Sequence, residues 1–269
     1  MTNKNIDSLN SFGYVLLQNM IPPDRINEIK NELERQSKNL NSNEILHQQE
    51  DQLILKNVFS LCPTLFLPLL DIDEIKLILS DVFTDGYILQ SMNASRANPI
   101  GDNFHELRAH IDSRLPVKEF SNTLALGVAY CIDDFTEDNG ATRVWPFSHL
   151  SGKRPEYYKE IGLSIPNPIT VTAKAGDIMI FASHLWHAVG PNRTQNARWG
   201  IFTFFNPWWM KPTYDYTDCG EELFNLLTLH QKQLFGFNSQ VPSMHSSRNY
   251  TKTKIDDLPN EYINAKRIN

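Results

Sequence analysis

The chain has 269 residues, with 25 Lys and Arg against 31 Asp and Glu, a net charge of −6, and 41% hydrophobic residues. This length and apolar content are sufficient for a substantial core. No stretch approaches the roughly 20 consecutive apolar residues of a membrane span, so we expect no membrane partner. The acidic balance predicts no nucleic-acid partner, and the polar first residues, which contain no apolar signal segment, predict a cytoplasmic protein. We therefore expect a small-molecule substrate, whereas no pattern predicts the oligomeric state.

About residues 1–85 are predicted to form a helical cover. The sequence IPPD at residues 21–24 is typical of a helix start, because proline is favoured in the first turn. Apolar residues then recur on one helical face, at Ile26, Ile29 and Leu33. A second helix is predicted over residues 73–83, where Ile75, Ile78, Leu79 and Val82 repeat with helical spacing.

Residues 86–206 are predicted to form a β core. Short runs of β-branched and aromatic residues, separated by turn sequences, predict strands at 87–92, 124–132, 169–173, 178–182 and 201–205. Because no helix separates each pair of strands, the pattern favours an antiparallel sandwich or jelly roll. A helical segment and a polar tail are expected over residues 207–269. We predict a single domain spanning residues 1–269, mainly β with flanking helices.

The sequence His110-Ile111-Asp112, followed 75 residues later by His187, is a candidate metal site. Residues two apart in an extended chain point to the same side, so His110 and Asp112 can reach one ion. With His187 they would form a face of two histidines and one carboxylate. Such a face leaves three octahedral positions open, which suits Fe(II) in oxygenases better than a structural zinc. The alternative is a His-Asp ion pair on a strand.

Arg198 is a candidate ligand for an anion. It enters an otherwise apolar strand, and an antiparallel turn after His187 would bring it back towards the interior. A buried guanidinium needs a partner, and a carboxylate that accepts two hydrogen bonds is a natural one. The alternative is an ordinary ion pair with Asp177 or Glu137.

The sequence resembles the phytanoyl-CoA dioxygenase family of iron(II)- and 2-oxoglutarate-dependent oxygenases. The resemblance runs from about residue 10 to residue 206. It rests on CIDDFTEDNGATR at 131–143, PFSH at 146–149 and AGDIMIF at 175–181, together with His187, Gly190-Pro191-Asn192 and Arg198.

This resemblance implies a double-stranded β-helix, the cupin-like jelly roll. It implies that His110, Asp112 and His187 bind Fe(II), and that the enzyme uses 2-oxoglutarate and O2. It also implies that Arg198 holds the distal carboxylate of 2-oxoglutarate, with help from Thr142.

The sequence departs from the family pattern at three positions. Ile111 stands where Gln is frequent, Phe147 replaces the Gly of the usual PGSH turn, and Ala129 replaces a common Trp. The altered turn and the aromatic content favour a small metabolite over an acyl-CoA.

The expected activity is hydroxylation, desaturation or rearrangement of a metabolite, as in secondary metabolite biosynthesis, with release of succinate and CO2. Trp208 and Trp209, after the last predicted strand, are candidate substrate contacts. An acyl-CoA or lipid hydroxylase of the same family is one alternative. A jelly-roll binding protein without metal is another.

Overall fold

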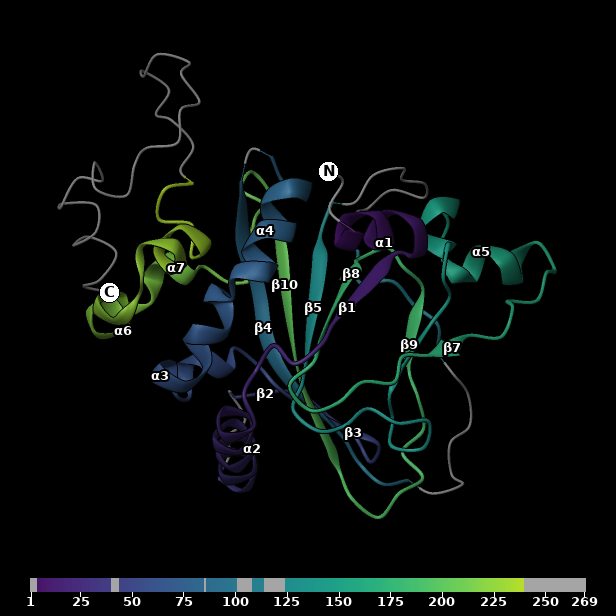
Figure 1. The fold of residues 1–269 in the computed structure, drawn as a ribbon, viewed down its shortest axis with the longest axis horizontal. Helices are drawn as coiled ribbons and strands as arrows, with labels where there is room; N and C mark the ends of the chain where they lie inside the picture. Colours follow the sequence, from purple (N-terminus) through teal and green to yellow (C-terminus); the bar gives the residue numbers. More distant parts are fainter. Residues whose placement is uncertain (1–3, 40–43, 85, 101–107, 114–123, 240–269) are drawn as a thin grey trace. The chain divides into compact units, whose positions relative to one another are not determined.

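The computed structural model describes residues 4–39, 44–84, 86–100, 108–113 and 124–239 (Figure 1). The chain divides into two compact units, one of residues 1–58 and 92–204 and the other of 59–91 and 205–269. The described α-helices are α1 (Lys4–Phe12), α2 (Pro23–Lys38), α3 (Pro63–Phe66), α4 (Asp73–Val82), α5 (Pro155–Glu160), α6 (Gly220–Leu226) and α7 (Leu229–Leu234). The 3-10 helices are η1 (Val58–Ser60), η2 (Leu67–Asp71), η3 (Ser148–Ser151) and η4 (Tyr216–Asp218). Within the described residues, none of the helices has the length and apolarity to cross a bilayer.

The strands form two sheets. They are β1 (Tyr14–Leu17), β2 (Ile45–Gln48), β3 (Gln52–Leu55), β4 (Tyr87–Ala97), β5 (Leu126–Cys131), β6 (Thr142–Val144), β7 (Ile169–Thr170), β8 (Ile178–Ala182), β9 (His187–Val189) and β10 (Arg198–Pro207). The larger sheet has the order β1-β8-β5-β10-β4-β3-β2, and the smaller has the order β7-β6-β9. The register pairs are antiparallel, for example Val128 of β5 with Ile180 of β8. This is the predicted class, mainly antiparallel β with flanking helices.

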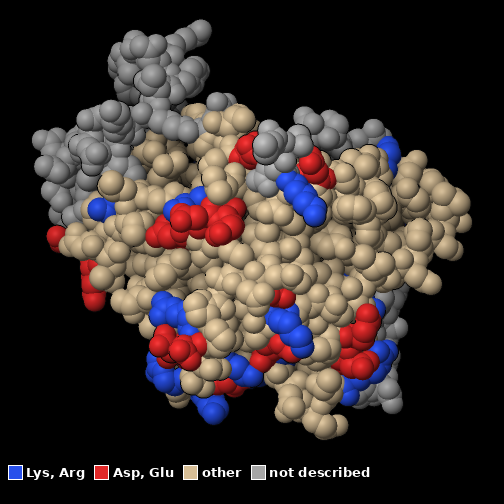
Figure 2. Space-filling model, in the orientation of Figure 1, with Lys and Arg blue, Asp and Glu red and all other residues tan. Residues whose placement is uncertain are grey.

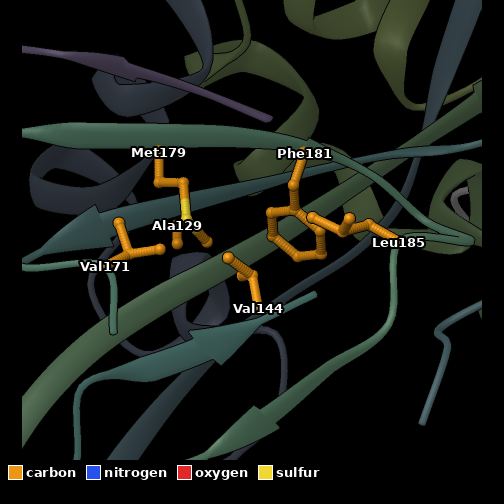
Figure 3. Packing of buried hydrophobic residues seen from close by; sticks show 6 residues of the cluster. All are labelled: Ala129, Val144, Val171, Met179, Phe181 and Leu185. Atoms are coloured by element: carbon orange, nitrogen blue, oxygen red, sulfur yellow. The ribbon is translucent and has the colours of Figure 1, made fainter. Parts of the chain in front are cut away.

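The core of the first unit lies between the two sheets. Strands β5 and β8 of the larger sheet contribute Ala129, Met179 and Phe181, whereas β6 of the smaller sheet contributes Val144 (Figure 3). Strand residues on alternate positions face opposite sides, so these side chains mark the inner faces of the jelly roll. The loop residue Leu185 closes the same cluster near Phe181.

Helix α2 lies against β10 in the first unit. Its buried residues are those predicted from the helical spacing, Ile26, Ile29 and Leu33. The indole Nε1 of Trp199, at the start of β10, donates a hydrogen bond of 2.7 Å to Glu34 Oε1. Because Trp199 is fully buried, this bond satisfies a donor that water cannot reach.

In the second unit, α7 is fixed at its start by a capping box. Thr228 and Gln231 exchange side-chain-to-backbone bonds, and the Gln231 amide also donates to Asp71 Oδ2 at 2.7 Å. His230 Nδ1 lies 2.7 Å from Asp71 Oδ1. Asp71 at the end of η2 therefore anchors the first turn of α7.

Two predictions of secondary structure were wrong in part. The first third contains three strands, β1, β2 and β3, as well as helices, because its short apolar runs pair with other strands. The segment after Pro207 contains two short helices, since Thr228 starts a new helix after Leu227 leaves the helical conformation. The predicted polar tail from residue 246 lies outside the described residues, and the single-domain organisation stays a prediction.

Candidate metal centre and co-substrate site

His110, Asp112 and His187 lie together in the first unit. His187 begins β9, and the loop of residues 108–113 is attached to it by backbone bonds. His110 N donates to His187 O at 2.9 Å, and His187 N donates to His110 O at 3.0 Å. Asp112 N donates to Ser183 O at 2.8 Å. The loop therefore has a fixed register against the segment that carries the third residue.

Backbone carbonyls orient both imidazole rings. His110 Nδ1 lies 2.9 Å from Arg108 O, and His187 Nδ1 lies 2.9 Å from Leu185 O. Donation from a protonated Nδ1 leaves the Nε2 lone pair of each ring for a metal, as is common for metal-bound histidine. One ligand atom from each of the three residues lies within 4.8 Å of the others. This donor set fits Fe(II), because it supplies two nitrogens and one oxygen and leaves positions for other ligands.

The carboxylate of Asp112 dominates the electrostatics of the ligand set. Its Oδ2 is 3.1 Å from His187 Nε2, and its Oδ1 is 3.8 Å from His110 Nε2. Burial by itself lowers the pKa of His187, but the charge and hydrogen bond of Asp112 outweigh it and raise this pKa. The geometry also contains the predicted alternative, a His-Asp contact, with His187 rather than His110 as the closer partner of Asp112.

Arg198 is 2% exposed and begins β10. Its Nη2 donates to Gly140 O, and its guanidinium carbon lies 4.1 Å from the centroid of the Phe135 ring. Its Nε and Nη1 are buried and have no hydrogen-bond partner among the residues that the structure describes. Burial lowers the pKa of Arg198 to about 10, so the group stays charged at neutral pH. A buried cation with two unused donors fits a carboxylate such as that of 2-oxoglutarate.

The alternative partners of Arg198 are used elsewhere. Asp177 Oδ1 accepts from Asn19 N and its Oδ2 from Lys174 N, each at 2.8 Å. Glu137 Oε2 accepts from Arg143 Nη1 at 3.2 Å and from Thr170 Oγ1 at 2.5 Å. The ordinary ion pair that the sequence left open is therefore not formed.

Thr142 lies on the strand next to His187. In the register of β6 and β9, Val144 pairs with His187 and Thr142 pairs with Val189. Directly paired residues share a face of a sheet, and residues two apart share it as well. Thr142, which is buried, therefore shares the face of His187. Its contact with a co-substrate stays a prediction.

The tryptophans predicted as substrate contacts belong to the second unit. They follow β10, where Trp208 N donates to Gly86 O at 3.2 Å and Trp209 is 59% exposed. Their contact with substrate stays a prediction. Trp186 faces away from His187, as strand alternation predicts, because it packs with Trp145 in a separate cluster.

The sequence did not reveal what supports the ring of His187. The Phe181 ring packs edge-on against it, with 5.2 Å between ring centroids. Phe181 pairs across the sheet with Gly127, and a Cβ at residue 127 would collide with its ring. Glycine within a buried strand is a signal for such a close approach.

A family model described as phytanoyl-CoA dioxygenase matches residues 9–200. An uncharacterized protein of Mycobacterium tuberculosis is 25% identical over 248 residues, which cover 87% of this chain and 86% of that protein. The dioxygenase andF of Emericella variicolor is 27% identical over 118 residues, which cover 43% of this chain and 39% of that protein.

Two solved structures share the fold. HygX of Streptomyces hygroscopicus, with nickel and 2-oxoglutarate bound, has a TM-score of 0.61 and 14% identity, covering 77% of this chain and 87% of its own. The alpha-ketoglutarate-dependent epimerase SnoN from nogalamycin biosynthesis has a TM-score of 0.62 and 16% identity, covering 78% and 85%. These similarities confirm the cupin-like jelly roll predicted from the sequence.

Proposed function

The chain belongs to the phytanoyl-CoA dioxygenase family, and we propose that it hydroxylates, desaturates or rearranges a small metabolite in secondary metabolite biosynthesis. It is an iron(II)- and 2-oxoglutarate-dependent dioxygenase, an oxidoreductase that uses O2. Because the chain belongs to a dioxygenase family, the alternative of a jelly-roll binding protein without metal is set aside. The names of related proteins favour the metabolite, since one similar structure holds hygromycin B and another holds a nogalamycin compound.

In this proposal His110, Asp112 and His187 hold the metal. The two Nε2 atoms and the carboxylate would hold the ion with three donors, which would leave it able to bind co-substrate and O2. Iron(II) with 2-oxoglutarate and O2 supplies the oxidising chemistry, with release of succinate and CO2. The protein fixes the ligand set, through the backbone bonds of the 108–113 loop and the carbonyl contacts of both Nδ1 atoms.

The observation that carries the proposal is the state of Arg198. A buried guanidinium with Nε and Nη1 unpaired is costly for the fold by itself. Because Nε and Nη1 lie on different edges of the guanidinium, the distal carboxylate of 2-oxoglutarate would accept from one of them together with Nη2, and Thr142 would contact the same co-substrate. Carboxylate binding would then offset the free-energy cost of burying the unpaired guanidinium. It would also make the site selective for a dicarboxylate co-substrate.

The test is substrate-dependent release of succinate from 2-oxoglutarate. Wild-type enzyme loaded anaerobically with Fe(II) is mixed with O2 and a panel that contains cyclic, amino-sugar, aromatic and fatty acyl-CoA compounds. We expect turnover with a small metabolite and none in Asp112→Ala. Turnover with acyl-CoA alone would support the alternative substrate class. Full activity of Asp112→Ala, or failure of the wild-type protein to bind 2-oxoglutarate, would contradict the proposal.

A further inference from the structure

Asn139 lies in the loop of residues 133–140, which joins β5 to β6 in the first unit. Its carboxamide bridges this loop, because Oδ1 accepts from Thr136 N at 2.8 Å and Nδ2 donates to Asp134 O at 2.7 Å. These two backbone groups belong to the peptide units on either side of Phe135. One half-buried side chain therefore fixes the direction in which the loop presents the Phe135 ring.

The same loop supplies two contacts of Arg198. The guanidinium carbon lies 4.1 Å from the centroid of the Phe135 ring, and the carbonyl of Gly140 accepts from Nη2. Gly140 directly follows Asn139 and has a φ of 84°, in the left-handed region that favours glycine. The loop therefore contacts both a face and an edge of the guanidinium.

The backbone of the loop is attached to the chain on both sides of Arg198. Asp133 N donates to Trp199 O at 3.2 Å, and Asp133 Oδ2 accepts from Trp199 N at 2.8 Å. At the other end of the loop, Arg193 N donates to Asp138 O at 2.7 Å. Because both ends are anchored, the conformation inside the loop decides how the guanidinium is held.

The orientation of this guanidinium decides where its remaining donors point. Nε and Nη1 of Arg198 have no partner among the described residues, and a carboxylate would accept from one of them together with Nη2. A Cβ at Gly200 would lie 3.0 Å from the Phe135 ring and 3.3 Å from Nη1, so these groups are closely packed. A shift of the ring would therefore turn the donors away from a carboxylate.

The charge of one face of the molecule bears on the same point. Lys and Arg side chains are interspersed with Asp and Glu over the described residues of the face in Figure 2, without a large area of one sign. A dianion that approaches this face meets no broad cationic surface. The buried guanidinium is then the group that can select a dicarboxylate, and its orientation matters accordingly.

We propose that Asn139 is a positioning residue for the co-substrate. It holds the Phe135 ring and the Gly140 carbonyl against the guanidinium, and thereby directs the remaining donors of that group to the distal carboxylate of 2-oxoglutarate. The proposal rests on the proposed function and adds a residue to its co-substrate site. Because Asn139 acts through Arg198, its loss should weaken binding of the distal carboxylate and spare the 2-oxo acid end of the ligand.

Two 2-oxo acids of equal chain length test the proposal: 2-oxopentanoate has a methyl group where 2-oxoglutarate has its distal carboxylate. Their Kd values are measured by calorimetry on anaerobic protein loaded with Fe(II). We expect Asn139→Ala to raise the Kd of 2-oxoglutarate about five- to tenfold and to leave that of 2-oxopentanoate within about twofold. Asn139→Asp, which keeps the acceptor for Thr136 N, should give a smaller rise. Adding Phe135→Leu to Asn139→Ala should raise the Kd by less than the product of the two single effects.

Thr228→Ala is a matched control, because it removes a side chain that also bonds the backbone, at the start of α7 in the second unit. It should leave both Kd values unchanged. Equal rises for the two acids in Asn139→Ala, as a general loosening of the site would give, would overturn the proposal. An unchanged Kd of 2-oxoglutarate in both Asn139 variants would overturn it as well.

Arg198→Met separates failure of this inference from failure of the proposed function. In Arg198→Met, adding Asn139→Ala should have no further effect on the Kd of 2-oxoglutarate. If Arg198→Met raises this Kd and Asn139→Ala does not, the co-substrate site stands and the positioning role fails. If neither variant changes it, the assignment of Arg198 to the co-substrate fails too.

Discussion

Replacement of Arg198 by Met should separate the co-substrate site from the stability of the fold. The side chain is 2% exposed, and two of its donors, Nε and Nη1, have no partner within the described part of the chain. A carboxylate that accepts from one of them together with Nη2 would form two charge-assisted bonds, and loss of such a pair costs about 2 to 5 kcal/mol. We therefore expect the Kd of 2-oxoglutarate to rise at least about 30-fold, while iron content stays unchanged.

The stability of the protein without co-substrate should change little. The substitution removes a bond to Gly140 O and a cation–π contact with Phe135, each contributing about 1 kcal/mol. It also removes a buried charge whose desolvation costs several kcal/mol. These contributions oppose each other, so the free energy of unfolding should stay within about 2 kcal/mol of wild type.

The assay is denaturant unfolding with and without 2-oxoglutarate, together with calorimetry of its binding. At a concentration 100 times the wild-type Kd, 2-oxoglutarate should stabilise the wild-type protein by about 2.7 kcal/mol, and the variant by at most about 0.9 kcal/mol at the same concentration. Arg143→Met is a matched control, because Arg143 is already paired with Glu137. An unchanged Kd in Arg198→Met would refute the reasoning and assign Arg198 a purely structural role.

Further predictions concern the metal ligands and their surroundings. An Asp112→Ala, His187→Ala double variant should bind no iron by elemental analysis, and full occupancy would contradict the ligand assignment. With Asp112 present no position remains for chloride, so mass spectrometry should find no chlorinated product in excess chloride. Gly127→Ala should push Phe181 towards His187, destabilise the fold by about 1–3 kcal/mol and weaken iron binding, with partial rescue by adding Phe181→Leu. Burial lowers the pKa of His184 in the folded protein to about 4, so on acidification the unfolded chain takes up a proton at a higher pH than the folded protein does. The free energy of unfolding should therefore fall by about 3 kcal/mol between pH 6.5 and pH 4. His184→Gln should flatten this pH dependence, measured by urea unfolding, and an unchanged slope would contradict it.

The sequence predicted the parts of the site that depend on local spacing. A two-residue separation places His110 and Asp112 on one side of an extended loop, and the return of the chain through a turn brings Arg198 into the same unit. Strand β8 was predicted with its observed bounds, because five consecutive apolar residues between turns have few alternatives. The iron and co-substrate roles themselves came from the family resemblance.

The features that were missed depend on pairing between distant segments. Strands β6 and β9 have three residues each, too few for a period of two to be recognised. The contact of Phe181 with His187 needs the register of β5 against β8, which no local pattern specifies. The hydrogen bond from the Trp145 indole to Pro166 O involves the segment 163–168, which is rich in proline and has no regular periodicity.

The metal centre owes its geometry to one short stretch of chain. The loop of residues 108–113 has no regular structure of its own, and His110, Asp112 and Ser113 hold it by donating to His187 O and Ser183 O. The segment 183–187 therefore contains one proposed ligand, His187, and fixes the other two through its backbone. Because the protein's own backbone supplies these bonds and the Nδ1 contacts, little ordering would remain for iron binding to cost. The affinity for iron should consequently be more sensitive to substitutions that displace the backbone of residues 183–187 than to substitutions on the exposed side of His110.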